Sequence, residues 1–300
     1  MERLRTHQIF WNAHVRKEKN RERNLEKRIH TDLVWQEIEP LIRPGIRVLD
    51  AGGGFGRYSM ALARRGCRVV HLDLSPSMVE EARQQAQEAG VSMEFVVGKV
   101  QDLSCFAEES FDLVLSLDAP VSYAYPEEKK ALQELIRVTK RFLVISVVNR
   151  LGQVPVALEM ELRWHKKLTW TKKFWESGNW DHPSFFEAVE ERIPFFSRFL
   201  FPPLHAFTPQ EIIDLVTDNG LRIRRCVATG TLARLLSPAI RKKLIRNQEL
   251  YQEFLELSRR YDAQFEVLGV GCKVASGFLL VGEKEKRDEE NMGESDIYPA

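Results

Sequence analysis

The chain has few cysteines, almost no net charge and no long hydrophobic run, and each absence excludes a class of protein. Lys and Arg number 44 against 43 Asp and Glu, which argues against a general electrostatic grip on nucleic acid. No apolar stretch is long enough to cross a bilayer, and the charged start Met1–Arg5 leads into no signal core. The cysteines are too far apart for a CxxC zinc site or a dense disulfide framework: Cys67, Cys105, Cys226 and Cys272. We therefore expect a cytoplasmic protein without a metal site.

Residues 46–150 alternate between short apolar runs and helical stretches. The runs are rich in Val, Leu and Ile, as in parallel strands that helices cover on both faces. The predicted fold class is therefore α/β, with a doubly wound Rossmann-like sheet. We expect strands at 46–50, 67–72, 93–97, 111–117 and 142–148, followed by 221–227 and 274–281.

The remaining segments interrupt or flank that pattern. The basic run Arg16–Arg28 also contains acids and is typical of a solvated helix face. Low apolar content predicts a disordered end of the chain. The predicted organisation is an N-terminal helical segment (1–43), an α/β core (44–150), an aromatic-rich cap insertion (151–207), continued core (208–230), a helical insertion (231–266), the last core strand (267–284) and a disordered tail (285–300).

The segment VLDAGGGFGRY, residues 48–58, predicts a ligand site. A strand ends in glycines and a helix follows, so a ligand can approach the backbone at the carboxyl end of the sheet. Arg57 stands where a dinucleotide fingerprint has its final small residue. Asp50 would repel a pyrophosphate but suits a cationic ammonium group, which favours S-adenosylmethionine over NAD.

A second carboxylate, Asp73, ends the next predicted strand. At that place it can accept hydrogen bonds from both ribose hydroxyls of an adenosine. In an alternative interpretation both acids only cap loops and the glycines only form a tight turn. Because the glycine loop and both acids lie on consecutive predicted strands, we expect a nucleoside site.

These motifs resemble those of the class I S-adenosylmethionine-dependent methyltransferases, in particular the small-molecule branch that includes quinone-biosynthesis enzymes. The resemblance covers residues 45–150 continuously and resumes at 207–228 and 272–284. It implies a seven-stranded sheet with a mostly helical cap, and S-adenosyl-L-methionine as the cofactor. The matching segments are 48–58 (first motif), 73–78 (ribose motif), 111–117 (fourth strand) and 207–211 (entry to a late helix).

The resemblance assigns the glycine loop to the cofactor. It implies that Asp50 and Gly52 face the methionine end. Gly54 and Gly56 would line the cofactor along its backbone, and Asp73 would hold the ribose.

The adenine would lie between Leu74 and Met78, although Met78 is as well explained by core packing. In the motif that contacts the adenine edge, residues 98–103, Lys99 replaces the acid that is usual in the family. The contact to the adenine amine would therefore pass to Gln101 or Asp102, while the N–H of Val100 serves the ring nitrogen.

The end of the fourth strand is where an acceptor would react. The backbone at Leu117 would pass near the methionine amine. Asp118 and Tyr123 are candidate catalytic residues, because either could orient or deprotonate an acceptor. Tyr123 is equally explained by packing of its loop. Methyl transfer is an in-line displacement that the cofactor already activates, so a strong base is not required.

The cap insertion is rich in aromatic residues. Between positions 160 and 207, 12 of 48 residues are aromatic, against 10% of the whole chain. Such a lid would suit an apolar or aromatic acceptor and exclude water. The alternatives are a cap whose aromatics form their own core, or a basic face resting on an anionic membrane. One amphipathic helix is expected through Met160, Trp164, Leu168, Thr171 and Trp175.

Two further segments bear on the site. The family resemblance implies that an N-terminal segment closes over the cofactor through Phe10, Trp11 and His14. The helical insertion completes the cap or makes a dimer contact, and the sequence leaves the oligomeric state open.

The predicted function is methyl transfer to O, N or C of a small, apolar or aromatic molecule. One alternative is an RNA methyltransferase, which the balanced charge disfavours. The other is a protein that binds S-adenosylmethionine or a nucleoside without turnover. Peripheral membrane contact is expected only with a lipid-like substrate.

Overall fold

The structure is a computed structural model, and it describes residues 2–164, 168–181, 202–263 and 275–284. Its centre is a seven-stranded sheet with the order β3-β2-β1-β4-β5-β9-β8. The strands are β1 (Arg47–Ala51), β2 (Arg68–Asp73), β3 (Glu94–Val97), β4 (Phe111–Ser116), β5 (Thr139–Val148), β8 (Leu221–Ala228) and β9 (Gly277–Lys284).

Strands β1 to β5 pair in parallel, whereas β9 runs antiparallel between β5 and β8. Each expected strand lies within three residues of an observed one. Continuous apolar runs located the strands because most residues of β1, β4 and β5 are buried. The predicted α/β class and seven-stranded sheet are confirmed.

Helices cover both faces of this sheet. One face packs against α2 (Leu25–Ile38), α3 (Arg57–Arg64) and the end of α14 (Gln248–Ala263). The other packs against α5 (Pro120–Tyr123), α6 (Glu128–Val138) and α11 (Pro209–Asp218). Neighbouring strand residues serve opposite faces, as Val48 and Leu49 of β1 do.

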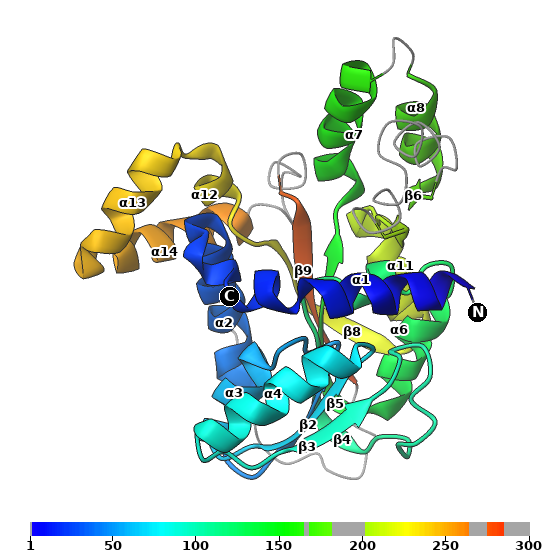
Figure 1. The fold of residues 1–300 in the computed structure, drawn as a ribbon, viewed down its shortest axis with the longest axis vertical. Helices are drawn as coiled ribbons and strands as arrows, with labels where there is room; N and C mark the ends of the chain where they lie inside the picture. The colour runs from blue at the N-terminus through cyan, green and yellow to red at the C-terminus, as the bar shows by residue number, and fades with distance from the viewer. Residues whose placement is uncertain (1, 165–167, 182–201, 264–274, 285–300) are drawn as a thin grey trace.

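The N-terminal segment forms two helices, α1 (Glu2–Lys19) and α2, joined by the 3-10 helix η1 (Arg21–Arg23). Figure 1 shows α1 crossing the molecule between the sheet below it and the helices of the cap above it. Gln8 donates to the carbonyl of Leu74 (3.2 Å), and Ser75 donates to Asn12 (2.5 Å). These bonds attach α1 to the loop between β2 and α4 (Pro76–Glu88).

The described residues of the cap form the helices α7 (Arg150–Trp164) and α8 (Thr169–Ser177), beside the short strands β6 (Asn179–Trp180) and β7 (Leu204–His205). The expectation of one helix through positions 160–175 is therefore wrong. The carboxylate of Glu161 accepts the N–H of Trp170 (3.0 Å) and of Thr171 (2.9 Å). A carboxylate that satisfies free N–H groups at a helix start stabilises a new helix, so the apolar stripe is divided between two helices.

The second insertion forms α12 (Thr231–Leu235), α13 (Pro238–Arg246) and α14, which lie on the left of Figure 1. Their buried side chains form a small core with α2, made by Ile29, Leu33, Ala233, Leu244, Tyr251 and Leu255. The insertion thus supports the N-terminal helices instead of extending the aromatic cap.

Parts of the predicted organisation fall on residues that lie outside the described ranges. These are the tail expected at 285–300, much of the aromatic cap (182–201), and the approach to the last strand (264–274). Within the described ranges, no helix combines the length and the apolar character that a membrane span needs.

Candidate active site

A cavity of about 1240 Å³ opens at the carboxyl ends of β1, β2 and β4. Its wall includes the glycine loop after β1, Asp73 after β2 and Asp118 after β4. Trp11 of α1, Met160 of α7 and Phe174 of α8 line it from the other side. The N-terminal segment and the cap therefore enclose the same space as the loop that the sequence assigns to the cofactor.

The glycine loop is tightly packed behind and open in front. A Cβ on Gly52 would lie 2.4 Å from Pro120 Cγ, and one on Gly53 would lie 2.6 Å from His71 Nδ1. At Gly54, whose φ is +57°, a Cβ would meet nothing within 4 Å. Gly54 lines the cavity, so any side chain there would occupy space that is free for a ligand.

Asp73 holds this loop and also faces the cavity. Its Oδ2 accepts the N–H of Gly54 (2.8 Å), and its Oδ1 accepts the N–H of Ser75 (2.8 Å). Burial raises the pKa of Asp73 to about 6, against the two N–H donors that act to lower it. Each oxygen retains a lone pair, so the carboxylate can accept a further hydrogen bond from a ligand hydroxyl in the cavity.

The expected adenine contacts divide into two groups. Leu74, Met78, Val100 and Gln101 line the cavity. Asp102 does not line it: its exposed carboxylate accepts a bond from the Ser104 hydroxyl (2.8 Å). Between Gln101 and Asp102, which the sequence left open, the geometry favours Gln101.

Asp50 requires a correction. It is only 1% exposed and is absent from the cavity wall. Its Oδ2 accepts the N–H (3.1 Å) and the hydroxyl (2.6 Å) of Ser59 at the start of α3, and the same hydroxyl lies 2.9 Å from His71 Nδ1. Burial raises the pKa of Asp50 to about 6 and lowers that of His71 to about 4. Asp50 therefore supports the loop from behind and does not face a ligand.

Gly56 and Leu117 are also absent from the cavity wall. A Cβ on Gly56 would lie 3.1 Å from Ala82 Cβ, so this glycine allows α3 to approach α4 closely. Leu117 is 4% exposed and belongs to the core beneath the sheet edge. Their expected contacts with the cofactor are not supported by this geometry.

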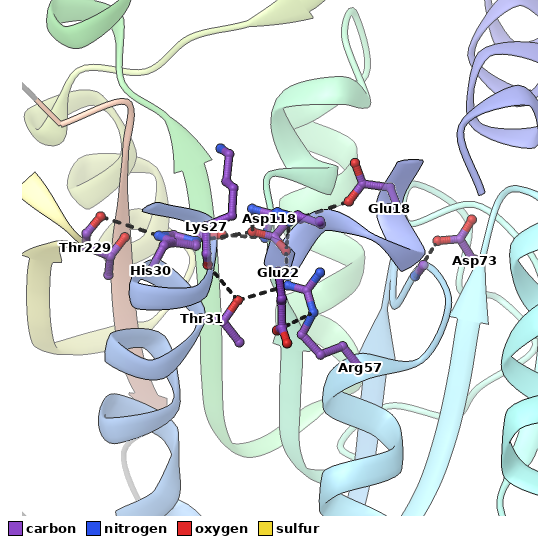
Figure 2. Close-up of polar contacts among 12 residues, drawn as sticks. Glu18, Glu22, Lys27, His30, Thr31, Arg57, Asp73, Asp118 and Thr229 are labelled. Carbon is purple, nitrogen blue, oxygen red and sulfur yellow. Dashed lines mark hydrogen bonds and ion pairs between the residues drawn. The ribbon is translucent and has the colours of Figure 1, made fainter. Parts of the chain in front are cut away.

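Asp118 lies at the centre of an ion-pair cluster (Figure 2). Arg21 of η1 donates to both carboxylate oxygens, at 2.9 Å for the bond to Oδ1. His30 Nε2 lies 3.2 Å from Oδ1, and Arg57 Nη1 lies 3.5 Å from Oδ2. Asp118 itself has a φ of +64°, an uncommon conformation for a residue with a side chain. Its carboxylate thus connects η1, α2 and α3 to the end of β4.

This cluster argues against Asp118 as a general base. Burial alone would raise the pKa of Asp118, but Arg21 and His30 outweigh it and hold the pKa well below its usual range. A carboxylate with so low a pKa is a poor proton acceptor. The favourable ion pairs give Asp118 a structural role: it anchors the N-terminal helices over the cavity.

Tyr123 lies beside the N-terminal roof of the cavity, which α1, η1 and α2 form. Its ring packs edge-to-face on Trp11, with the ring centroids 5.3 Å apart, and it lines the cavity. Burial raises its pKa to about 12, so the hydroxyl keeps its proton near neutral pH. Tyr125, the other tyrosine of this loop, donates to Asp181 (2.6 Å) and thereby connects the loop to the cap.

The sequence interpretation missed the part of the site that α2 and η1 supply. The run 16–28 was expected to be a solvated face, but Arg21 and Lys27 line the cavity. Arg234 of the second insertion lines it too. The only signal for this in the sequence was the number of cations in the run, and that number does not show whether their side chains face solvent or the cavity. Among the described residues, no cluster of His, Cys, Asp and Glu is suited to a metal ion.

Comparison with known proteins agrees with this arrangement. Residues 48–141 match the family described as "Methyltransferase domain". The matched region includes the glycine loop and Asp73, which both line the cavity, and the space in front of Gly54 is free. It is a class I S-adenosylmethionine-dependent methyltransferase domain. Its cofactor is S-adenosylmethionine, and the free space at Gly54 beside an acceptor carboxylate suits a bound nucleoside.

The methyltransferase domain has relatives of different lengths. The chain is 27% identical over 247 residues to the tRNA 5-carboxymethoxyuridine methyltransferase of Escherichia coli, covering 80% of this chain and 83% of that protein. It is 41% identical over 75 residues to the ubiquinone biosynthesis O-methyltransferase of Xanthomonas campestris, covering 25% and 31%. The chain spans only 38% of the length of uncharacterised Mycobacterium tuberculosis proteins that it matches at 33% identity over 108 residues.

The fold of the methyltransferase domain also matches solved structures. The magnesium protoporphyrin IX methyltransferase of Synechocystis, solved with bound S-adenosylhomocysteine, superposes with a TM-score of 0.55 at 16% identity. That likeness covers 94% of this chain and 100% of the other. It shows that the two proteins share a fold.

Proposed function

We propose that this protein transfers the methyl group of S-adenosylmethionine to a small molecule held in the cavity beside β4. The observation that carries the proposal is the continuity of the cavity. Gly54, Asp73 and Gln101 line it where the cofactor would bind, and Trp11 and Tyr123 line it beneath the N-terminal roof. Donor and acceptor can therefore meet in one cavity, in the close and aligned approach that an in-line displacement requires.

The cofactor supplies a methyl group that its sulfonium already activates. In the proposal, Asp73 holds the ribose hydroxyls, while Leu74, Met78 and Gln101 contact the adenine. Trp11 and Tyr123 exclude water from the reacting atoms. No residue needs to act as a strong base, which agrees with the ion-paired state of Asp118.

A nucleic acid acceptor is the second candidate. It is favoured by the tRNA-modifying relative, which matches most of this chain, and by the exposed cations Arg16, Lys17 and Arg23 at the cavity. The balanced total charge still favours a small molecule. The third candidate is a protein that binds the cofactor without turnover. The cytoplasmic location stays a prediction.

The first test is calorimetric titration with S-adenosylhomocysteine, beside NAD on the same preparation. We expect the former to bind and the latter not to bind. Gly54→Val should abolish binding, because the added side chain fills the space in front of the loop. Gly90→Val is the matched control: Gly90 also has a positive φ (+64°) and open surroundings, but it is absent from the cavity wall.

Equal binding by Gly54→Val and the wild type would contradict the assigned cofactor site. Binding of NAD alone would contradict the proposed activity. If S-adenosylhomocysteine binds and no small acceptor or transfer RNA is methylated, the non-catalytic alternative is favoured.

A further inference from the structure

The charges on the cavity wall are unequal. Among the described residues, seven Lys and Arg line it against four carboxylates. Each carboxylate already has partners. Glu26 binds Arg241 (2.7 Å), Glu18 lies 3.7 Å from Arg21, Asp73 accepts two backbone N–H groups, and Asp118 is held by its cluster. Two partly buried cations of this wall, Lys27 and Arg234, have no acceptor within the described ranges.

Lys27 is the first of these cations. It lies on α2, one turn before His30, and lines the cavity. Figure 2 shows its side chain extending away from the Asp118 cluster. Its ammonium has no hydrogen-bond acceptor within the described ranges. Burial and the nearby Arg21 lower the pKa of Lys27, and they outweigh the more distant carboxylates of Asp118, Glu26 and Glu18, which act to raise it.

Arg234 is the second. It lies on α12 and lines the same cavity. Its Nη1 is buried with no hydrogen-bond partner in the described part of the chain. The start of α12 abuts α2: a Cβ on Gly230 would lie 3.7 Å from His30 Cα. Two neighbouring elements thus each contribute to the lining of one cavity a cation that is unpaired among the described residues.

The position of Lys27 separates it from the nucleoside end of the cavity. In Figure 2, Lys27 and Asp73 lie on opposite sides of Asp118. Arg234 lies on α12, which begins two residues after Thr229, and the carbonyl of Thr229 lies 3.4 Å from His30 Nδ1. Asp118 attracts Lys27 through space, but its close ion pairs are with Arg21, His30 and Arg57. Leaving a buried cation without an anion is costly, so a ligand anion would be stabilised here.

We propose that Lys27 and Arg234 form an anion-binding subsite for the methyl acceptor, which therefore carries a carboxylate or phosphate group. The inference rests on the proposed function in one respect: it names the methyl acceptor as the molecule that occupies the subsite. The subsite narrows the expected apolar or aromatic acceptor to one with an anionic end. Arginine suits the planar, two-pronged geometry of such groups, and lysine contributes a compact charge.

The test uses the full chain saturated with S-adenosylhomocysteine and titrated with benzoate or phenyl phosphate up to 10 mM. Benzamide and benzyl alcohol are the neutral matches. We expect at least one anion to bind, and the neutral compounds to bind ten-fold more weakly or less. Lys27→Gln and Arg234→Gln should each weaken anion binding about ten-fold, the usual consequence of losing one charged hydrogen bond. Lys242→Gln and Arg246→Gln, which alter exposed cations of α13 that do not line the cavity, should change nothing.

Three results would overturn the proposal: no anion binding to the wild type, equal binding of the neutral compounds, or unchanged binding in both cavity variants. A fourth result would also overturn it: both variants bind S-adenosylhomocysteine more weakly than the wild type does, and benzoate binds to none of the three proteins. The two cations would then hold the carboxylate of the cofactor itself. Failure of the wild type to bind S-adenosylhomocysteine would count against the proposed function and leave the anion titration as a separate result.

A transfer RNA arm distinguishes the source of the anion. Unfractionated transfer RNA is titrated against the wild type and both cavity variants at two salt concentrations. If the subsite holds a small acceptor, transfer RNA binding should change less than two-fold in the variants. A ten-fold loss for transfer RNA without any loss for benzoate would overturn the small-acceptor assignment and favour a nucleic acid phosphate.

Discussion

Asp73 ends β2 and Asp118 lies two residues after β4, and both line the same cavity, yet their surroundings are opposite. Backbone N–H groups contact Asp73, and burial raises its pKa to about 6. Asp118 is paired with Arg21, His30 and Arg57, which hold its pKa well below the usual range. One carboxylate is therefore available to a ligand, whereas the other is committed to the protein.

This difference shows how one sheet edge combines binding with closure. Asp73 connects β2 to the glycine loop through local bonds, so its free lone pairs face the cavity. Asp118 connects β4 to helices that precede the sheet in sequence. The carboxyl end of a strand offers a place for an acid, and the elements packed around it decide what that acid does.

The largest effect is expected for Asp118→Ala. Removing the carboxylate leaves Arg21, Arg57 and His30 facing one another, and we expect a loss of about 3 kcal/mol in the free energy of unfolding. Urea denaturation measures it. Asp214→Ala, which removes an exposed acid of α11, should cost less than about 0.5 kcal/mol. Equal stability of the two variants would show that the cluster does not hold the N-terminal helices.

The pH dependence sharpens the same contrast. The folded pKa of Asp118 lies below its unfolded value, so its stabilisation is present above about pH 4 and is lost as the pH falls through the folded pKa. Asp73 has the opposite sign. Its pKa of about 6 exceeds the unfolded value, so its ionisation lowers stability as the pH rises to 6. Denaturation midpoints of Asp118→Asn and Asp73→Asn between pH 3 and 7 should differ from the wild type in opposite directions.

Asp73→Ala should weaken S-adenosylhomocysteine binding by about 1–3 kcal/mol, because the ribose hydroxyls lose their acceptor. Calorimetry measures the dissociation constant. Asp102→Ala serves as the control, since its exposed carboxylate binds Ser104 and does not line the cavity. Affinity unchanged by Asp73→Ala would refute the ribose contact.

The affinity of the wild type for S-adenosylhomocysteine should fall as the pH is lowered from 8 to 5. Protonation of Asp73 near its pKa of about 6 weakens it as an acceptor. Asp73→Asn, which cannot titrate, should flatten this dependence. A wild-type profile as flat as that of the variant would show that Asp73 does not titrate in the site.

The smallest effect is expected for Tyr123→Phe. Its raised pKa keeps the hydroxyl protonated near neutral pH, so loss of the hydroxyl should change the methyl-transfer rate less than about three-fold. Trp11→Ala removes its edge-to-face partner and should reduce the rate more, because water then enters the roof. A hundred-fold loss in Tyr123→Phe would restore this tyrosine as a catalytic residue.

Much of the core was predictable from the sequence because its signals are local. Apolar runs located the strands, and the glycine loop with Asp73 located one part of the cavity wall. Asp50 was placed wrongly because the same residue pattern does not show whether a carboxylate points forward to a ligand or back to Ser59. The cap stripe was also misinterpreted, because a bond from Glu161 to the next helix cannot be inferred from helical spacing.

The sequence by itself determined the α/β sheet, the turn at the glycine loop and the acid after β2, because each depends on residues close together in the chain. Only the tertiary structure decided the state of Asp118 and the exposure of Lys27 and Arg234 to the cavity. The partners of Asp118 lie 97, 88 and 61 positions away in sequence. Charge and desolvation depend on distance in space, and that distance is set only when α1, α2 and α12 pack over the finished sheet.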